Sequence, residues 1–202
     1  MSKLLTILSR ALSAVAYPLF IPTYGMVLYC LCYHTMTPML PVGAYIYYGV
    51  ATFILTCLIP LITILILIRK RVITDIYITN ADERRLPYLI TMMCYAIWCI
   101  VVIRTMHVLP AVRLSVIGAT MAICIVNFIN SYWKISAHLT GIGGLIGAFI
   151  LYQPLIGCVL LAVALMLIYA RLYLDAHTPL QVVCGFGLGL LCTLIPNLIY
   201  YV

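Results

Sequence analysis

Long apolar stretches separated by short polar connections make up most of the chain. A helix needs about 20 apolar residues to cross the hydrocarbon core of a bilayer, so these stretches predict membrane-spanning helices. The predicted segments lie at residues 11–33, 42–68, 86–105, 112–130, 139–152, 155–170 and 179–201. We therefore expect an all-α fold: a polytopic transmembrane helix bundle of six or seven segments, in which residues 1–202 form one integral membrane domain.

The first, fifth and sixth segments contain features that affect their shape. Pro18 and Pro22 predict a kink in the first segment, because proline removes a helical hydrogen bond and its ring clashes with the preceding turn. The fifth and sixth segments are short and are separated only by Gln153 and Pro154, which predicts either a tight helical hairpin or little tilt. A re-entrant path for one of these regions would reduce the number of crossings to six.

Glycine pairs at helical spacing occur in two of the segments. Gly143 and Gly147 lie four residues apart in the fifth segment, and Gly185 and Gly189 have the same spacing in the seventh. Such pairs let two helix backbones approach closely. The pattern predicts that the fifth and seventh segments pack against each other; the alternative is that membrane helices merely tolerate these glycines.

The composition agrees with a membrane protein and excludes several other classes. Hydrophobic residues make up 66% of the chain and charged residues only 7%, with a mean hydropathy of +1.22, whereas soluble domains contain about 25% charged residues. The net charge of +7 does not indicate nucleic-acid binding, because the cations lie at the ends of apolar stretches as topology signals. The nine cysteines lack metal-ligand spacing, so we expect no metal and no other cofactor.

Polar residues suited to chemistry gather in three connections. If the segments alternate across the membrane, the connections after the second, fourth and sixth segments emerge on the side of the N-terminus. Nine of the 11 basic residues fall on that side. The three connections hold Arg84, Arg85 and Pro87, then Lys134, Ser136 and His138, and then Arg171, His177 and Gln181. We therefore expect any chemical site on this face.

The connection before the fifth segment has the features of an anion site. Ser136 is expected to cap the helix, leaving the positive helix end directed at whatever lies above it. Lys134 adds a full positive charge, and His138 lies in the first turn, where it can exchange a proton with a bound oxyanion. The alternative has equal weight: a lysine that extends to the lipid headgroups, a serine that only caps, and a histidine with an ordinary interfacial role.

A second anion site is predicted before the seventh segment. Thr178 and Gln181 have capping-box spacing, so His177 would lie just outside a second positive helix end. Gln181 either accepts a hydrogen bond from the His177 ring or serves only as the capping-box partner. The planar guanidinium of Arg171 is suited to a phosphate, the alternative being contact with lipid headgroups.

Taken together, these motifs resemble the type 2 phosphatidic acid phosphatase superfamily, whose members carry K-x6-R-P, P-S-G-H and S-R-x5-H-x3-D. The resemblance covers a motif-bearing core at about residues 82–189, and its most specific part is Arg171 followed by His177 and a glycine-rich helix. The chain looks like a short bacterial branch of this family, which implies the cytoplasmic membrane of a bacterium.

The resemblance implies roles for individual residues. His177 corresponds to the nucleophile that accepts the phosphoryl group, and His138 to the acid that protonates the leaving oxygen. The remaining matches are the phosphate-binding arginines, Arg171 with Arg84 or Arg85, and the donors to the phosphate oxygens, Ser136 and the backbone amide of Ala137.

The chain departs from the family pattern at several positions. No basic residue lies seven positions before Arg84 or Arg85, so we expect Lys134 to supply that charge. Ile135 and Ala137 replace the proline and glycine of the second motif, and Ala170 replaces the serine of the third. Gln181 replaces the aspartate that orients the nucleophile. A neutral Gln181 would hold the His177 ring without stabilising its developing charge, so transfer would be slower than in relatives with aspartate.

These expectations favour an integral membrane phosphatase that works without a metal. Its substrate would be a lipid phosphate or pyrophosphate of the phosphatidic acid, phosphatidylglycerol phosphate or isoprenyl pyrophosphate type, hydrolysed through a phosphohistidine intermediate. The expected partners are the lipid bilayer and this substrate, not nucleic acid. Two alternatives remain open: a lipid or anion transporter that uses the same cations, and a catalytically silent lipid-binding relative.

Two arguments place the site on opposite sides of the membrane. The resemblance implies a site that faces away from the cytoplasm. Without the four candidate site cations, five basic residues still lie on the site face and two on the other, which favours a cytoplasmic site.

Overall fold

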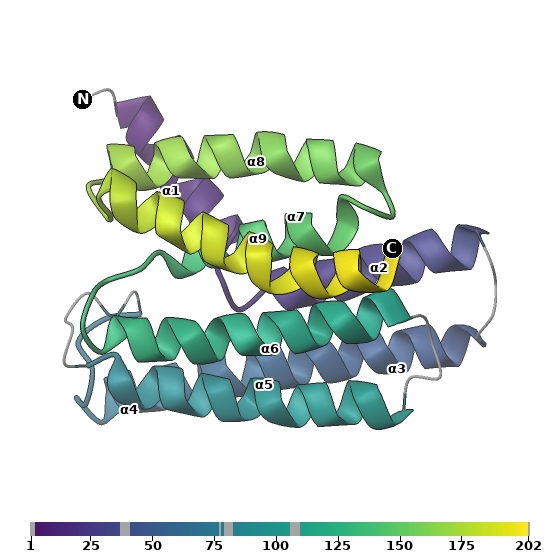
Figure 1. Ribbon diagram of the computed structural model, residues 1–202. Helices are drawn as coiled ribbons and strands as arrows, with labels where there is room; N and C mark the ends of the chain where they lie inside the picture. The colour runs from purple at the N-terminus through teal and green to yellow at the C-terminus, as the bar shows by residue number, and fades with distance from the viewer. Residues whose placement is uncertain (1–2, 37–40, 77, 79–82, 106–109, 202) are drawn as a thin grey trace.

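The computed structural model describes residues 3–36, 41–76, 78, 83–105 and 110–201. Asp82, the first residue of the predicted motif-bearing core, lies outside these ranges. The described residues are mainly helical and contain no strand, which confirms the prediction of an all-α bundle. The long helices run roughly parallel or antiparallel to one another (Figure 1).

The predicted first segment is two helices rather than one kinked helix. Helix α1 covers Lys3–Val15 and helix α2 covers Ile21–Met36, with a break between them. The physical reason is Pro18, which cannot donate a backbone hydrogen bond and disfavours the helical conformation of the residue before it. Helix α1 packs on α8, whereas α2 packs on α3 and α7.

Within the described ranges, five helical stretches are long and apolar enough to cross a membrane, so the chain is an integral membrane protein. The first consists of α3, a π-helical turn η1 and α4, which form one continuous stretch. Pro60 explains the π turn, because its ring would clash with a regular preceding turn. The bounds are α3 Val42–Phe53, η1 Ile54–Leu58, α4 Ile59–Arg69, α5 Arg85–Thr105, α6 Pro110–Asn130, α8 Pro154–Tyr173 and α9 Pro179–Tyr201.

Helix α7 (Ala137–Phe149) is short and lies at the centre of the bundle. Its 13 residues extend only about 20 Å, less than the hydrocarbon core of a bilayer. Most of its side chains are buried, because α2, α6, α8 and α9 pack around it. The surrounding helices rather than lipid therefore cover α7.

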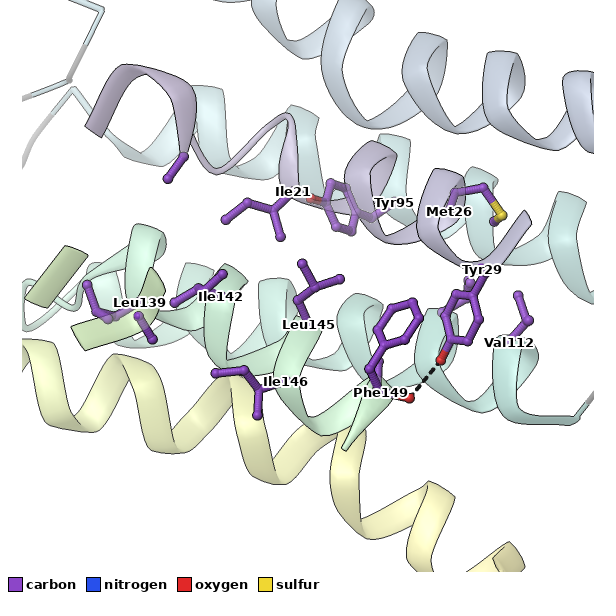
Figure 2. Close-up of a cluster of buried hydrophobic side chains, with 14 of the residues drawn as sticks. Ile21, Met26, Tyr29, Tyr95, Val112, Leu139, Ile142, Leu145, Ile146 and Phe149 are labelled. Atoms are coloured by element: carbon purple, nitrogen blue, oxygen red, sulfur yellow. Dashed lines mark hydrogen bonds between the residues drawn. The ribbon is translucent and has the colours of Figure 1, made fainter. Parts of the chain in front are cut away.

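The apolar core forms where α2 meets α7. Figure 2 shows Ile21 and Tyr29 of α2 directed toward the α7 side chains, among them Leu145 and Phe149. The rings of Tyr29 and Phe149 stack with centroids 4.3 Å apart, and the Tyr29 hydroxyl donates to the Ala148 carbonyl at 2.9 Å. These contacts hold the N-terminal half of the chain against the central helix.

Helices α7 and α8 form the predicted hairpin. The backbone amide of Gln153 donates to the Phe149 carbonyl at 2.7 Å and closes the turn between them. Helix α8 continues to Tyr173, three residues beyond the predicted end of the sixth segment. Arg171 therefore belongs to the last turn of a helix and not to the following connection.

Helices α7 and α9 make the most extensive helix–helix contact in the bundle. A Cβ atom at Gly189 would overlap the Thr140 carbonyl, and one at Gly185 would lie 2.6 Å from the Ser136 carbonyl oxygen. The backbone amide of Ser136 also donates to the Gln181 carbonyl at 3.3 Å. The close packing predicted from the glycine pairs is confirmed, and it places the first residues of α7 and α9 side by side.

We predict that Gly189→Ala destabilises the protein by about 1–3 kcal/mol, because the added methyl group meets a backbone carbonyl that cannot move aside. Gly187 lies on the same helix with open space around it, so Gly187→Ala is the matched control and should stabilise by up to about 1 kcal/mol through helix propensity. Unfolding in mixed micelles with an increasing fraction of denaturing detergent measures the free energy of unfolding of both variants. Equal effects of the two substitutions would contradict the packing.

Candidate active site

A cavity of about 690 Å³ lies at one end of the bundle. At this end α4, α6 and α8 finish and α5, α7 and α9 begin, and α1 lies nearby (Figure 1). Most of the predicted site residues lie in the wall of this cavity. Those lining the cavity are Arg84, Lys134, Ala137, His138, Arg171 and His177.

The end of α8 positions Arg171 and His177. Asp175 adopts a left-handed conformation with φ of 49°, and the amide of Ala176 donates back to the Arg171 carbonyl at 3.1 Å. Together with the Asp175 amide bond to Leu172, this is a Schellman motif, which ends a helix sharply. The chain reverses at this point, so the buried Arg171 side chain and the His177 ring line the same cavity.

Gln181 performs both of the functions that the sequence left open. Its Oε1 atom accepts from the Thr178 backbone amide at 3.1 Å. The backbone amide of Gln181 donates to the Thr178 hydroxyl at 3.4 Å, which completes the capping box. The same Oε1 lies 3.2 Å from His177 Nδ1. Because an amide oxygen only accepts, Nδ1 carries the proton and Nε2 keeps the lone pair that a nucleophile needs.

The connection before α7 is held by Lys134 and by backbone contacts. Lys134 Nζ donates to the Ala176 carbonyl at 2.7 Å and so joins this connection to the turn before α9. Ser136 occupies the N-cap position, but its side chain makes no capping bond, so that part of the prediction is wrong. The hydroxyl is fully buried without a partner among the described residues, and the Ser136 backbone is pressed against Gly185 of α9.

His138 is oriented by the break between α1 and α2. Its Nε2 atom lies 3.2 Å from the Ser13 carbonyl oxygen, and the Tyr17 ring meets the imidazole edge-on with centroids 5.9 Å apart. A carbonyl only accepts, so Nε2 carries a proton and the other ring nitrogen, Nδ1, remains for exchange with a ligand.

The structure separates the two adjacent arginines. Arg84 is 6% exposed, lines the cavity and donates from Nε to the Ile78 carbonyl at 3.0 Å. Arg85 is the first residue of α5 and is exposed, outside the cavity wall. The register at the start of α5 therefore directs only the first of the pair toward the candidate site.

Among the residues of the cavity wall that the sequence did not predict are Arg10, Ser13, Tyr17 and Asn130. Asn130 ends α6; its Oδ1 accepts from the Ile135 amide at 3.2 Å, while its Nδ2 is buried without a partner among the described residues. The available signal was a lone polar residue at the end of an apolar stretch. Residues 10, 13 and 17 carried no comparable signal, because they reach the site only through the break after α1.

The electrostatics of the cavity favour a neutral His177 and a bound anion. Burial and the positive charges of Lys134 and Arg171 lower the pKa of His177 to about 4, against the opposing effect of the hydrogen bond to Gln181. Burial and the charges of Arg84 and Arg171 also lower the pKa of Lys134. At neutral pH the His177 imidazole is uncharged, and an anion would relieve the repulsion among the cations.

This geometry can be compared with known families. Residues 115–201 match the PAP2 superfamily. The match agrees with the resemblance seen in the motifs and confirms it for this part of the chain. The match contains Lys134, His138, Arg171 and His177, whereas Arg84 lies outside it and reaches the same cavity from the start of α5. No curated protein and no solved structure matches the chain.

We predict that Lys134→Met raises the pKa of His177 above about 4, because removing a neighbouring positive charge makes protonation of the imidazole less costly. NMR titration of histidine-labelled protein in nanodiscs measures this pKa, with His177→Gln to assign the signal. Lys70→Met removes an exposed cation at the end of α4 and is the matched control. A wild-type value near 6.5, or equal shifts in both variants, would contradict this account.

Proposed function

We propose that the protein is a membrane phosphatase that hydrolyses a lipid phosphate or pyrophosphate through a phosphohistidine intermediate. The observation that carries the proposal is that His138 and His177, from the starts of two different helices, line one cavity together with Arg84, Lys134 and Arg171. The PAP2 superfamily match over residues 115–201 supports the reaction class.

The proposed reaction has two transfers. The bound phosphate dianion favours the protonated form of His138, in which Nδ1 carries a proton as well as Nε2. The Nε2 lone pair of His177 attacks phosphorus, the bond to the leaving oxygen breaks, and that oxygen keeps the electron pair and takes the Nδ1 proton of His138. Water then attacks the phosphohistidine and returns a proton to His138, which releases inorganic phosphate and restores His177. A phosphomonoester carries about two negative charges at pH 7, which the three cations would balance during both transfers.

A substrate embedded in the membrane fits the position of the cavity. The cavity lies at the ends of membrane-spanning helices, and its wall includes apolar side chains such as Leu19, Ile64 and Ile123 beside the charged ones. A headgroup can therefore bind at the charged wall while its hydrocarbon part stays among the helices. We place the protein in the cytoplasmic membrane of a bacterium, with the bilayer itself as its surroundings and substrate source.

We predict that purified protein in nanodiscs releases inorganic phosphate from phosphatidic acid or an isoprenyl pyrophosphate in the presence of a chelator. His177→Ala should abolish this turnover, and His138→Ala should lower kcat by about 10²–10⁴-fold. Radiolabelled substrate should leave acid-labile phosphate on the wild-type protein and on His138→Ala, but none on His177→Ala. Full turnover by His177→Ala would overturn the proposed nucleophile.

We predict that Gln181→Glu raises kcat about tenfold, equivalent to about 1.4 kcal/mol. Glutamate has the reach of glutamine, so it keeps the contact with His177 Nδ1 and adds a negative charge that stabilises the charge developing on the ring. The control is Gln153→Glu, the same substitution in the turn between α7 and α8, distant in the sequence from Gln181. It should leave kcat unchanged. If the wild-type protein shows no turnover and Gln181→Glu does not produce any, the protein is a catalytically silent relative.

A further inference from the structure

A second, smaller cavity of about 110 Å³ lies between α2, α5, α6 and α7. It adjoins the candidate active site, because Pro18, Tyr95, Ile123 and Ala137 line both cavities. Its wall is mainly apolar, and small residues such as Ala119 and Ala122 on α6 leave the space open. We refer to it as the slot.

The slot follows the central helix from its first turn to its last. Ala137, Gly141, Gly144 and Ala148 line it at spacings of three or four residues, which is one face of α7. The 11 helical steps from Ala137 to Ala148 extend about 16 Å. The hydrocarbon core of a bilayer is about 30 Å thick, so the slot is as long as the part that one leaflet occupies.

The width of the slot suits a single hydrocarbon chain. The volume of about 110 Å³ is spread along the roughly 16 Å of α7 that the slot follows, so the slot is narrow along its length. Helices α2 and α7 approach closely along it: a Cβ atom at Gly25 would lie 2.8 Å from Leu145 Cδ1. Two chains side by side therefore have no room, whereas a segment of one chain fits.

The end of the slot away from the active site is polar. The Tyr29 hydroxyl lies 2.8 Å from Ser115 Oγ and donates to the Ala148 carbonyl, the bond drawn in Figure 2, and Asn197 Nδ2 donates to Ser115 Oγ at 3.0 Å. These groups are buried and bonded to one another, so a hydrocarbon chain that displaced them would leave polar atoms without partners.

We propose that the slot binds one hydrocarbon chain of the lipid substrate and that the Tyr29, Ser115 and Asn197 cluster limits how far this chain extends. This inference rests on the proposed function for the identity of the headgroup. A lipid with a second chain keeps that chain in the bilayer. The protein thereby selects substrates by the length of a single chain as well as by phosphate.

The first test compares hexadecyl phosphate with phenyl phosphate as substrates. Ala119→Phe fills the slot and should lower the ratio of the two kcat/KM values about tenfold or more. Cys124→Phe adds the same ring to the exposed side of the same helix and should leave the ratio within twofold of wild type. Ala119→Leu is the milder variant if the phenylalanine disturbs folding. If the ratio of the two kcat/KM values is unchanged in a folded Ala119 variant, the proposal that the slot binds a substrate chain is wrong.

A second test uses the same series to examine the polar end. Tyr29→Leu removes the hydroxyl and shortens the side chain, so the preferred chain among decyl, tetradecyl and octadecyl phosphate should move to a longer member. An unchanged preference in the folded variant would overturn the limiting role of the cluster.

The third test needs no turnover and separates the slot from the proposed function. Trp98 lines the slot and Trp133 does not, so Trp133→Phe leaves one fluorescent reporter. Bromoalkyl phosphate should quench Trp98 saturably in a His177→Ala background, and Ala119→Phe should abolish the quenching. Equal quenching by a bromoalkane without phosphate would indicate that Trp98 contacts bulk lipid, and it would overturn the proposal that the slot binds a substrate chain. If Trp98 is quenched but the protein that retains His177 shows no turnover, the slot proposal holds and the proposed phosphatase function is wrong.

Discussion

The backbone contact between α7 and α9 is the constraint on which the candidate site depends. Helix α9 carries no side chains at Gly185 and Gly189, so the carbonyls of Ser136 and Thr140 at the start of α7 lie directly against its backbone. This contact places the two helix starts side by side, and with them His138 and His177. The chemistry of the site therefore relies on residues that have no functional groups of their own, and the histidines occupy the same cavity because the glycines permit it.

Gln181 illustrates how this site differs in character from one built on a carboxylate. Its oxygen accepts two hydrogen bonds, one that begins α9 and one that sets which nitrogen of His177 carries the proton. Orientation is thus supplied by a neutral amide, while the described cavity wall carries four cations, Arg10, Arg84, Lys134 and Arg171, against the one carboxylate of Asp175. The part of the chain that matches the PAP2 superfamily provides both histidines, whereas α1, the break after it and the start of α5 line the cavity from outside the match.

The long helices and the α7–α9 contact could be predicted because apolar length and glycine spacing are local signals. The start of α9 at Pro179 agrees with the predicted segment, and so does the capping box behind it. The contribution of α1 could not be predicted: Ser13 acts on His138 through a backbone carbonyl, which any residue possesses. Likewise, the choice between Arg84 and its neighbour depends on a rotation of about 100° at the start of a helix, which spacing alone does not determine.

The shortness of α7 has a consequence for how the protein is made. A helix of 13 residues cannot reside in the bilayer by itself, so it must enter together with α8 as a hairpin. Even then its glycine face stays open until α9 has been inserted against it. Completion of the candidate site is thus a late event in biogenesis: a ribosome-bound chain that has already placed α1 to α8 in the membrane still lacks His177 and Gln181 at the cavity.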